Sequence, residues 1–402
     1  MSQRVFITGF GIITSIGNNT EENFQSLVHG RCGFGELTIL ETIHRNTLPC
    51  CEIKLSDQEL HDLAGVNTGR GYTRTSLLGL IAVQEALKSA GLSKSELREA
   101  GLLSATTTGG IREFEKNIYN ILDLAKDGDF TQFTDTANPG EHCERIADYA
   151  GIKKYIATVS TACSSSANSI MQGAQLIKNN LLDIAIVGGS EALSKFTISG
   201  FNALMIIDSE HCRPFDNTRK GLNLGEGAAY LVLESEASAT RRKKVPIAEL
   251  KGYGNANDAF HQTASSPEGR GALHAMQQAL QTSNISSSQI DYINAHGTAT
   301  ENNDLSEGNG IQQLFGSKVP FFSSTKPYTG HTLAAAGSIE AVFCVMALQH
   351  QMIWPNRNFV HQMPELSITP VKHFKENVKL RHVLSNSFGF GGNTSSLLLS
   401  SV

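Results

Sequence analysis

The chain has 402 residues, of which 40% are hydrophobic and 18% are charged, and its formal net charge is −5. This length can bury one large α/β core or two medium ones. The acidic balance argues against a surface that binds nucleic acid or anionic membrane as a whole, so we expect neither partner.

The seven cysteines are odd in number and include no C-x-x-C pair with the spacing of a metal site. This usage is typical of a reduced protein, so we expect a cytoplasmic location. No apolar run approaches the ~18–20 residues that cross a bilayer, and we expect no membrane span. Three glycines within residues 5–17 favour a buried first strand over a signal peptide.

Strand and helix patterns alternate along the chain, as in βαβ units, and their order repeats. The first half reads as strand, helix, strand, strand–turn–helix and closing strand in residues 5–13, 76–92, 101–110, 155–177 and 228–235. The second half repeats this order in residues 246–254, 271–285, 290–300, 321–348 and 395–401. Any long α/β chain shows some alternation, but the matched order favours a duplication, with one half in residues 1–240 and the other in 241–402.

Cys163 lies in VSTACSSS (159–166), where a β-branched run stops and a serine-rich helix begins. At a helix N-terminus the free N–H groups and the macrodipole favour the thiolate, which is the nucleophilic form. The Cys163 N–H is also a candidate donor for an oxyanion hole. A free cysteine is more often buried and inert, and Cys163 taken alone leaves both interpretations open.

Two histidines occupy comparable positions in the second half. His296 follows the strand pattern 290–294, and His331 lies at the strand-to-helix turn that matches the turn of Cys163. A single histidine is usually a surface or core residue, so these two indicate function only jointly. Neutral imidazoles can donate hydrogen bonds to a thioester oxygen and stabilise an enolate that decarboxylation creates.

Three further features lie near these residues. Lys326 precedes His331 by five residues and either assists electrostatically or holds the loop through an ion pair. Glu340 is expected to be a buried structural carboxylate near Lys326. The turn NSFGFGGNTS (386–395) lacks the lysine of a phosphate-binding loop and precedes a strand, so we expect a hinge that carries the aromatic gate Phe390.

Together, the segments VSTACSSS, NAHGTAT, STKPYTGH and NSFGFGG resemble the β-ketoacyl-acyl carrier protein synthases, the elongating condensing enzymes of the thiolase superfamily. The likeness covers nearly the whole chain. It implies an α/β fold with five layers, αβαβα, built from two duplicated halves. It also implies a homodimer, or a heterodimer with a related subunit, and substrates carried on the phosphopantetheine of acyl carrier protein, with no other cofactor.

The resemblance assigns the catalytic roles position by position. Cys163 is similar to the nucleophile that receives the acyl group, and His296 and His331 to the pair that binds the malonyl thioester. Lys326 matches the lysine beside the site. Phe390 matches the gating phenylalanine, whose backbone N–H completes the oxyanion hole with that of Cys163.

The resemblance also assigns supporting positions. Thr298 and Thr300 match threonines that bind phosphopantetheine. The second active-site loop is expected to include Asp258 and Thr263. A structural cation is surrounded in some members by positions that match Asn294, Glu340 and Ser385. The strand 155–160 is expected to pair across a dimer axis.

Departures from the family pattern concern the substrate more than the chemistry. Thr108 and Phe201 match positions that line the acyl pocket. The family usually has glycine or an aliphatic residue at the position of Thr108, so this threonine predicts an unusual acyl chain. Met205 replaces an arginine that meets the carrier protein, so the candidates for a shifted basic patch are Arg70, Arg74 and Arg213. The order GFGGNT replaces GFGGTN and places Thr394 where an asparagine is usual.

We therefore expect a decarboxylative Claisen condensation that yields 3-oxoacyl-acyl carrier protein, in fatty acid or in polyene/polyketide-type chain elongation. The alternative is a subunit that resembles a chain-length factor and has little activity of its own, but such a subunit has no need of a nucleophile. A biosynthetic thiolase would use a second cysteine near the C-terminal glycine turn, and residues 345–402 hold none. An initiating synthase or a cysteine protease would not explain His331.

Overall fold

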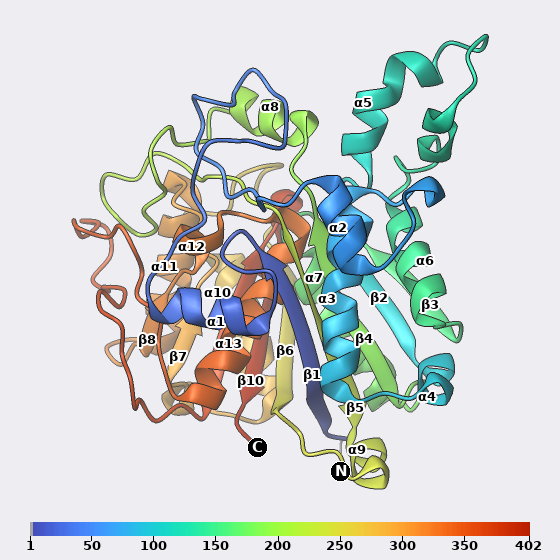
Figure 1. Cartoon of the computed structure of the whole chain (residues 1–402). Helices are drawn as coiled ribbons and strands as arrows, with labels where there is room; N and C mark the ends of the chain where they lie inside the picture. The colour runs from blue at the N-terminus through green and yellow to red at the C-terminus, as the bar shows by residue number, and fades with distance from the viewer. Residues whose placement is uncertain (1–2) are drawn as a thin grey trace.

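Within residues 3–402, which the computed structural model describes, ten strands follow the order β3-β2-β4-β5-β1-β6-β10-β9-β7-β8. Their bounds are Val5–Thr14 (β1), Gly101–Ala105 (β2), Tyr155–Val159 (β3), Ile184–Glu191 (β4), Gly227–Ser235 (β5), Ala248–Asn257 (β6), Tyr292–Asn294 (β7), Phe321–Ser323 (β8), His382–Phe388 (β9) and Asn393–Ser400 (β10). Figure 1 shows the later strands to the left of β6 and the earlier strands to the right of β1.

The strand order is the same when read inward from either edge. One side reads β3-β2-β4-β5-β1 and the other β8-β7-β9-β10-β6. Strand directions match as well, because β2 is parallel to β3 and β4, and β7 is parallel to β8 and β9. The two sides join where β1 meets β6, with Phe6 opposite Glu249 and Ile7 opposite Ala248.

Helices form the other three layers. The bounds are Thr20–Val28 (α1), Asp57–Ala64 (α2), Arg74–Ala90 (α3), Lys94–Glu99 (α4), Ile111–Ile121 (α5), Pro139–Ala150 (α6), Ser165–Lys178 (α7), Lys195–Ala203 (α8), Glu236–Arg242 (α9), Arg270–Ser283 (α10), Glu301–Phe315 (α11), Lys326–Thr329 (α12) and Ala336–His350 (α13). The central helices α7 and α13 contact strands of both sides, whereas α3 covers β1, β4 and β5, and α10 covers β6, β9 and β10. The expected layering αβαβα is therefore present.

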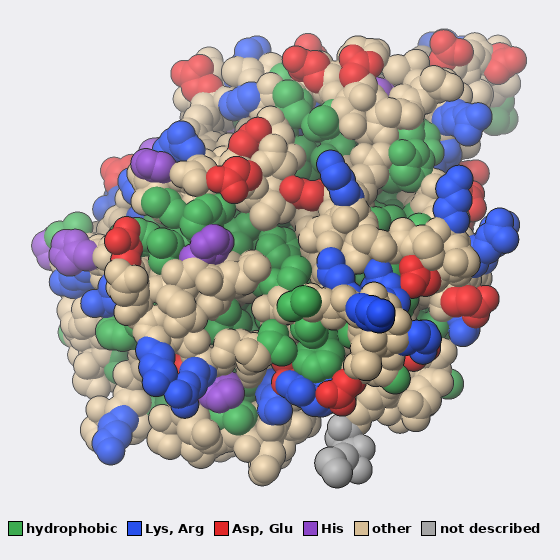
Figure 2. Space-filling view, turned by 60° about the horizontal axis from the view of Figure 1, so that its bottom comes forward, with side chains coloured by type: hydrophobic (Ala, Val, Ile, Leu, Met, Phe, Trp, Pro, Cys, Tyr) green, Lys and Arg blue, Asp and Glu red, His purple; other side chains and the backbone are tan. Residues whose placement is uncertain are grey.

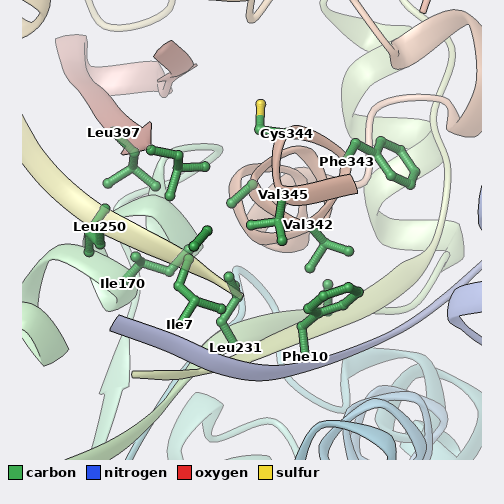
Figure 3. Close-up of a cluster of buried hydrophobic side chains, with 14 of the residues drawn as sticks. Ile7, Phe10, Ile170, Leu231, Leu250, Val342, Phe343, Cys344, Val345 and Leu397 are labelled. Carbon is green, nitrogen blue, oxygen red and sulfur yellow. The ribbon is translucent and has the colours of Figure 1, made fainter. Parts of the chain in front are cut away.

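The central helix α13 is apolar around most of its circumference, as expected for a helix enclosed by two sheets, and Glu340 is its one buried charged residue. Residues Ala336–Leu348 are all buried. Figure 3 shows its side chains against the strands β1, β5, β6 and β10, with the labelled residues Val342, Phe343, Val345, Ile7, Phe10, Leu231, Leu250 and Leu397. The Cys344 sulfur points away from this group in the same view.

Two glycines of β1 allow α3 to approach the sheet closely. A Cβ atom added at Gly11 would lie 2.2 Å from the Ala82 carbonyl oxygen, and one at Gly9 would lie 2.7 Å from that of Ala86. Phe10, between them, points to the other face and packs in the central cluster. In the sequence GFG, the two glycines therefore leave room for α3 on one face of β1, and Phe10 fills the central core on the other.

One helical stretch, Leu333–His350, is long and apolar enough to cross a membrane by length and composition alone, but 89% of it is buried inside the fold. It is the central helix with the turn before it, so its apolar character is explained by the core. On the face displayed in Figure 2, lysine and arginine side chains are interspersed with acidic and apolar ones.

Candidate active site

A cavity of about 380 Å³ joins residues from both halves of the chain. Its walls contain eight of the residues predicted for the site, namely Cys163, Phe201, Thr263, His296, Thr298, Thr300, His331 and Phe390. Cys163 follows β3, His296 follows β7 and His331 follows β8. These are carboxyl ends of parallel strands, which is where α/β folds gather their chemistry.

The elbow between β3 and α7, residues 160–164, presents Cys163 to the cavity. Ala162 takes the left-handed conformation, with φ of 53°, which non-glycine residues rarely adopt. The turn is held by Ser165, whose Oγ accepts a hydrogen bond from the Thr161 N–H at 2.8 Å. Gly389 packs against the elbow so closely that an added Cβ would lie 2.6 Å from the Thr161 carbonyl oxygen. The elbow is thus strained and tightly held.

The Cys163 thiol differs from the sequence-based expectation of a favoured thiolate. Burial raises the pKa of Cys163 to about 12, although the Lys326 ammonium and a hydrogen bond from the Phe390 N–H act in the opposite direction. Only 5% of the residue is exposed. Desolvation of the charged form outweighs the helix terminus here, so the resting group is a thiol.

His296 is held in one tautomer by Lys326. The Lys326 Nζ lies 3.2 Å from His296 Nδ1 and also donates to the His296 carbonyl oxygen. An ammonium has only donors, so Nδ1 must accept and the neutral ring carries its proton on Nε2. Burial and then the Lys326 charge hold the pKa of His296 well below its usual range. The ring is therefore a neutral hydrogen-bond donor.

His331 lies beside His296, with ring centroids 5.3 Å apart and ring planes at 85°. Its backbone is fixed by two hydrogen bonds, from its own N–H to the Asn223 carbonyl at 2.7 Å and from the Gly225 N–H to its carbonyl at 3.0 Å. Burial and the Lys326 charge lower the pKa of His331 well below the usual value. The cavity thus presents two neutral imidazoles side by side.

Lys326 is itself buried and paired. Its Nζ lies 2.5 Å from Glu340 Oε1, and both side chains are almost fully enclosed. Burial raises the pKa of Glu340 to about 7, against the effect of Lys326. The sequence left two roles open for Lys326, and the geometry supports both, because one ammonium contacts His296 and pairs with Glu340.

The gate residue Phe390 stacks on Phe201, with ring centroids 5.7 Å apart and planes at 21°. Both rings line the cavity with Cys163. The Phe390 N–H lies close enough to the Cys163 sulfur to act on its pKa in the lowering direction. An aromatic pair therefore lines the cavity that also contains the thiol.

The family models decide the class of protein. The model of the β-ketoacyl synthase N-terminal domain matches residues 2–239, and that of the C-terminal domain matches residues 247–360. The chain belongs to the β-ketoacyl synthase family.

Relatives of this β-ketoacyl synthase match it over nearly their whole length. The 3-oxoacyl-(acyl-carrier-protein) synthase 2 of Staphylococcus aureus strain COL is 31% identical over 407 residues, which cover 99% of this chain and 98% of the relative. The protein of the same name from Vibrio cholerae serotype O1 is 30% identical over 409 residues, with 98% of each chain covered.

Solved structures agree with this assignment. The ishigamide ketosynthase/chain length factor has a TM-score of 0.91 at 30% identity, with 100% of both chains covered. The ketosynthase ApeO in complex with its chain length factor ApeC, from Xenorhabdus doucetiae, has a TM-score of 0.87 at 30% identity, with 100% of this chain and 98% of that chain covered. The predicted thiolase-like ketosynthase fold is thus confirmed.

Some residues expected at the synthase site lie elsewhere. Arg74 cannot meet a carrier protein, because it is only 1% exposed and its Nη2 lies 2.7 Å from Glu226 Oε1. This corrects the predicted carrier contact. Arg213 is paired with Glu210. Arg70 is exposed, but it does not line the cavity.

Thr108 is also absent from the walls of the synthase cavity. Its hydroxyl donates to the buried carboxylate Glu191 at 3.0 Å. The hydroxyls of Thr106 and Thr107 donate to the same carboxylate, at 3.1 and 2.6 Å. The hydroxyl of Thr108 is thus committed to the framework of this loop.

Lys220, which the sequence reading did not single out, does line the cavity and is exposed. It lies in the irregular segment between α8 and β5, where the sequence carries no periodic signal that separates one lysine from another. Only the folded structure shows that Lys220 lines the cavity.

Proposed function

We propose that the chain catalyses a decarboxylative Claisen condensation between an acyl group on Cys163 and malonyl-acyl carrier protein, which yields 3-oxoacyl-acyl carrier protein. The observation that carries this proposal is the single cavity that joins a thiol to two neutral imidazoles. Lys326 holds one of these imidazoles in the donor tautomer. Membership of the β-ketoacyl synthase family supports the same reaction.

In the first step the Cys163 sulfur attacks the carbonyl carbon of an acyl thioester. The backbone N–H groups of Cys163 and Phe390 stabilise the oxyanion of the tetrahedral intermediate. The carrier thiolate leaves, takes up the proton that Cys163 loses, and dissociates as a thiol. Burial raises the pKa of Cys163, so the sulfur starts as a thiol and loses its proton in the course of the attack.

In the second step the malonyl thioester oxygen accepts hydrogen bonds from His296 and His331. The carbon–carbon bond to the carboxylate breaks, carbon dioxide leaves, and the electron pair forms an enolate that these donors stabilise. The enolate carbon attacks the acyl carbonyl on Cys163, the carbon–sulfur bond breaks, and the cysteine thiolate that leaves takes up a proton from water. Thr298 and Thr300 on the cavity wall bind the phosphopantetheine arm.

A structural cation fits the residues that the resemblance indicates for it. In the part of the chain that the structure describes, the oxygens Asn294 Oδ1, Glu340 Oε2 and Ser385 Oγ are buried without a hydrogen-bond partner. Oxygen donors that lack partners are the donors that a hard cation takes. Such an ion would hold Glu340, and with it Lys326, in place by its charge.

The working unit is a dimer that receives its substrates from acyl carrier protein. Among the strands of residues 3–402, β3 pairs only with β2, which leaves its other edge free, and Ile156 on it is 42% exposed. The likeness to ketosynthase and chain length factor complexes supports pairing with a related subunit as well as with a second copy. Arg70, Arg213 and Lys220 are the candidate contacts for the carrier protein.

A chain-length-factor-like role is the second candidate, because the solved neighbours include ketosynthases paired with a chain length factor. The two roles make different demands on the cavity. A subunit that only shapes its partner's pocket needs neither a thiol nor paired imidazoles. The retained set of Cys163, His296 and His331 therefore favours the catalytic role.

Reconstitution tests the proposal directly. Protein incubated with acylated carrier protein and malonyl carrier protein should give a carrier-bound product that is two carbons longer, read by intact mass. Acyl donors of graded length, both saturated and polyunsaturated, would define the chain that is accepted. If no donor is extended, alone or with a candidate partner subunit, the proposed reaction is wrong.

The histidine pKa values give a second test. Burial and the Lys326 charge lower both, so His296 and His331 should stay neutral at pH 6, whereas an exposed histidine titrates near about 6.5. Nuclear magnetic resonance of ring-labelled histidine would follow each residue, with a short histidine-containing peptide in the same buffer as the reference. In Lys326→Met the pKa values of His296 and His331 should rise but stay below that of the peptide, because burial remains. Titration of His296 together with the peptide in the wild-type protein would contradict this.

A further inference from the structure

Three asparagine side chains meet beside the elbow that carries Cys163. Asn393 Oδ1 accepts hydrogen bonds from Ser164 Oγ at 2.7 Å and from Asn168 Nδ2 at 2.8 Å. It accepts a third from Asn255 Nδ2 at 3.0 Å. These residues come from β10, the elbow, α7 and β6, so one amide oxygen joins four parts of the chain. We call Asn168, Asn255 and Asn393 the amide cluster.

Further hydrogen bonds anchor the amide cluster on both sides. Asn168 Nδ2 also donates to Thr161 Oγ1 at 2.8 Å, and Thr161 belongs to the elbow. Asn168 Oδ1 accepts from Ser395 Oγ on β10 at 2.6 Å. The cluster thus ties the elbow of the first half to a strand of the second half.

The order of two neighbouring residues places this amide on the correct face of the sheet. Successive side chains of a strand point to opposite faces. Leu397 packs in the central cluster around α7 and α13, whereas Leu398 packs in the outer cluster with α10. Asn393 therefore faces the central layer, and Thr394 faces outward and donates to the Ala256 carbonyl at 3.0 Å. The reverse order, threonine before asparagine, would carry the amide away from the elbow.

The backbone of Asn393 also closes the loop that holds Phe390. We define the gate loop as residues 389–392. The Gly389 N–H donates to the Asn393 carbonyl at 2.8 Å, and Gly389 packs directly against the elbow backbone. One residue therefore closes the gate loop through its main chain and holds the elbow through its side chain.

We infer that Asn393 is a positioning residue that couples the gate loop to the Cys163 elbow, so that the gate stays closed over the thiol until substrate displaces it. This rests on the proposed role of Phe390 as the gate. The essential atom is the Asn393 Oδ1 acceptor, because it takes three of the four hydrogen bonds of this side chain, whereas Nδ2 makes one, at 3.4 Å.

The test is the rate at which iodoacetamide alkylates each cysteine, resolved by peptide mass spectrometry. Cys163 is buried and should react slowly in the wild-type protein. The rate at exposed Cys32 measures the reactivity of the reagent, and the rate at buried Cys344 shows whether the core stays folded. Asn393→Ala removes the acceptor of three hydrogen bonds, so alkylation of Cys163 should rise by at least about tenfold, a factor that the net loss of one to two hydrogen bonds already gives. The rates at Cys32 and Cys344 should not change.

Two matched variants decide the mechanism. Asn393→Asp keeps an acceptor oxygen for all three donors and should leave the Cys163 rate close to wild type. Thr394→Val alters the neighbouring residue on the opposite face and should also leave it unchanged. The inference is overturned if Asn393→Ala reacts at the wild-type rate, if Asn393→Asp reacts as fast as Asn393→Ala, or if Cys344 becomes reactive together with Cys163. Alkylation needs no turnover, so this result is independent of whether elongation is observed.

Discussion

Replacement of Cys163 by alanine should abolish the acyl enzyme and lower elongation by at least ~10³-fold, the scale of loss when a covalent nucleophile is removed. The sulfur is the group on the cavity wall that can carry an acyl chain next to the N–H groups of Cys163 and Phe390. The substitution should leave the fold intact, because it removes one sulfur atom from the edge of a cavity.

The same variant should still decarboxylate malonyl carrier protein, since His296, His331 and Lys326 remain in place. Carbon dioxide release without a condensed product would separate the two steps. Cys32→Ala, at an exposed cysteine, is the matched control and should elongate at the wild-type rate. Elongation by Cys163→Ala above one-tenth of the wild-type rate would rule out the covalent route.

Replacement of His331 by alanine should lower decarboxylation by ~10²–10³-fold, the usual cost of one donor that stabilises a developing oxyanion. The imidazole lies beside His296 in the cavity and is neutral because burial and Lys326 lower its pKa. Acylation of Cys163 should persist, because its oxyanion hole is built from backbone N–H groups.

His331→Asn retains an N–H donor and should lose less decarboxylation activity than His331→Ala. His274→Ala removes an exposed imidazole from α10 and serves as the control. Mass spectrometry of the acyl enzyme and release of labelled carbon dioxide would measure the two steps separately. Equal loss of both steps in His331→Ala would indicate a general structural defect and contradict the assigned role.

Much of the fold follows from patterns that are local in sequence. The repeated order of strands and helices predicted two similar halves, and the strand order does repeat from either edge. The turns after three strands predicted Cys163, His296 and His331, which share one cavity. Parallel strands bring their carboxyl ends to a common edge, so residues distant in sequence could be placed together without a structure.

The errors concern pairings over long sequence distances. Arg74 was expected on the surface, but Glu226, 152 residues later, neutralises it inside the fold. The thiol of Cys163 was expected to ionise readily, but the depth of burial that raises its pKa is set by elements from both halves. Sequence spacing gives neither the distance to a remote partner nor the loss of solvent, and both control the electrostatics of a site.

The amide cluster shows a second limit of prediction from the sequence. The change from TN to NT after the glycines was visible in the sequence, but its effect was not. Because successive side chains of a strand point to opposite faces, the change places the asparagine side chain on the other face of β10. Asn393 thereby reaches the elbow of Cys163, which lies on the inner face. The register of β10, not composition, gives Asn393 its role.

The most direct measurement is peptide mapping of the wild-type protein after incubation with acylated carrier protein and no malonyl donor. We expect one acyl group, bound as a thioester to the peptide that contains Cys163, and its release as a longer 3-oxoacyl product when malonyl carrier protein is added. If no carrier-bound donor acylates Cys163, with or without a partner subunit, the catalytic assignment is wrong and a role as a pocket-shaping subunit takes its place.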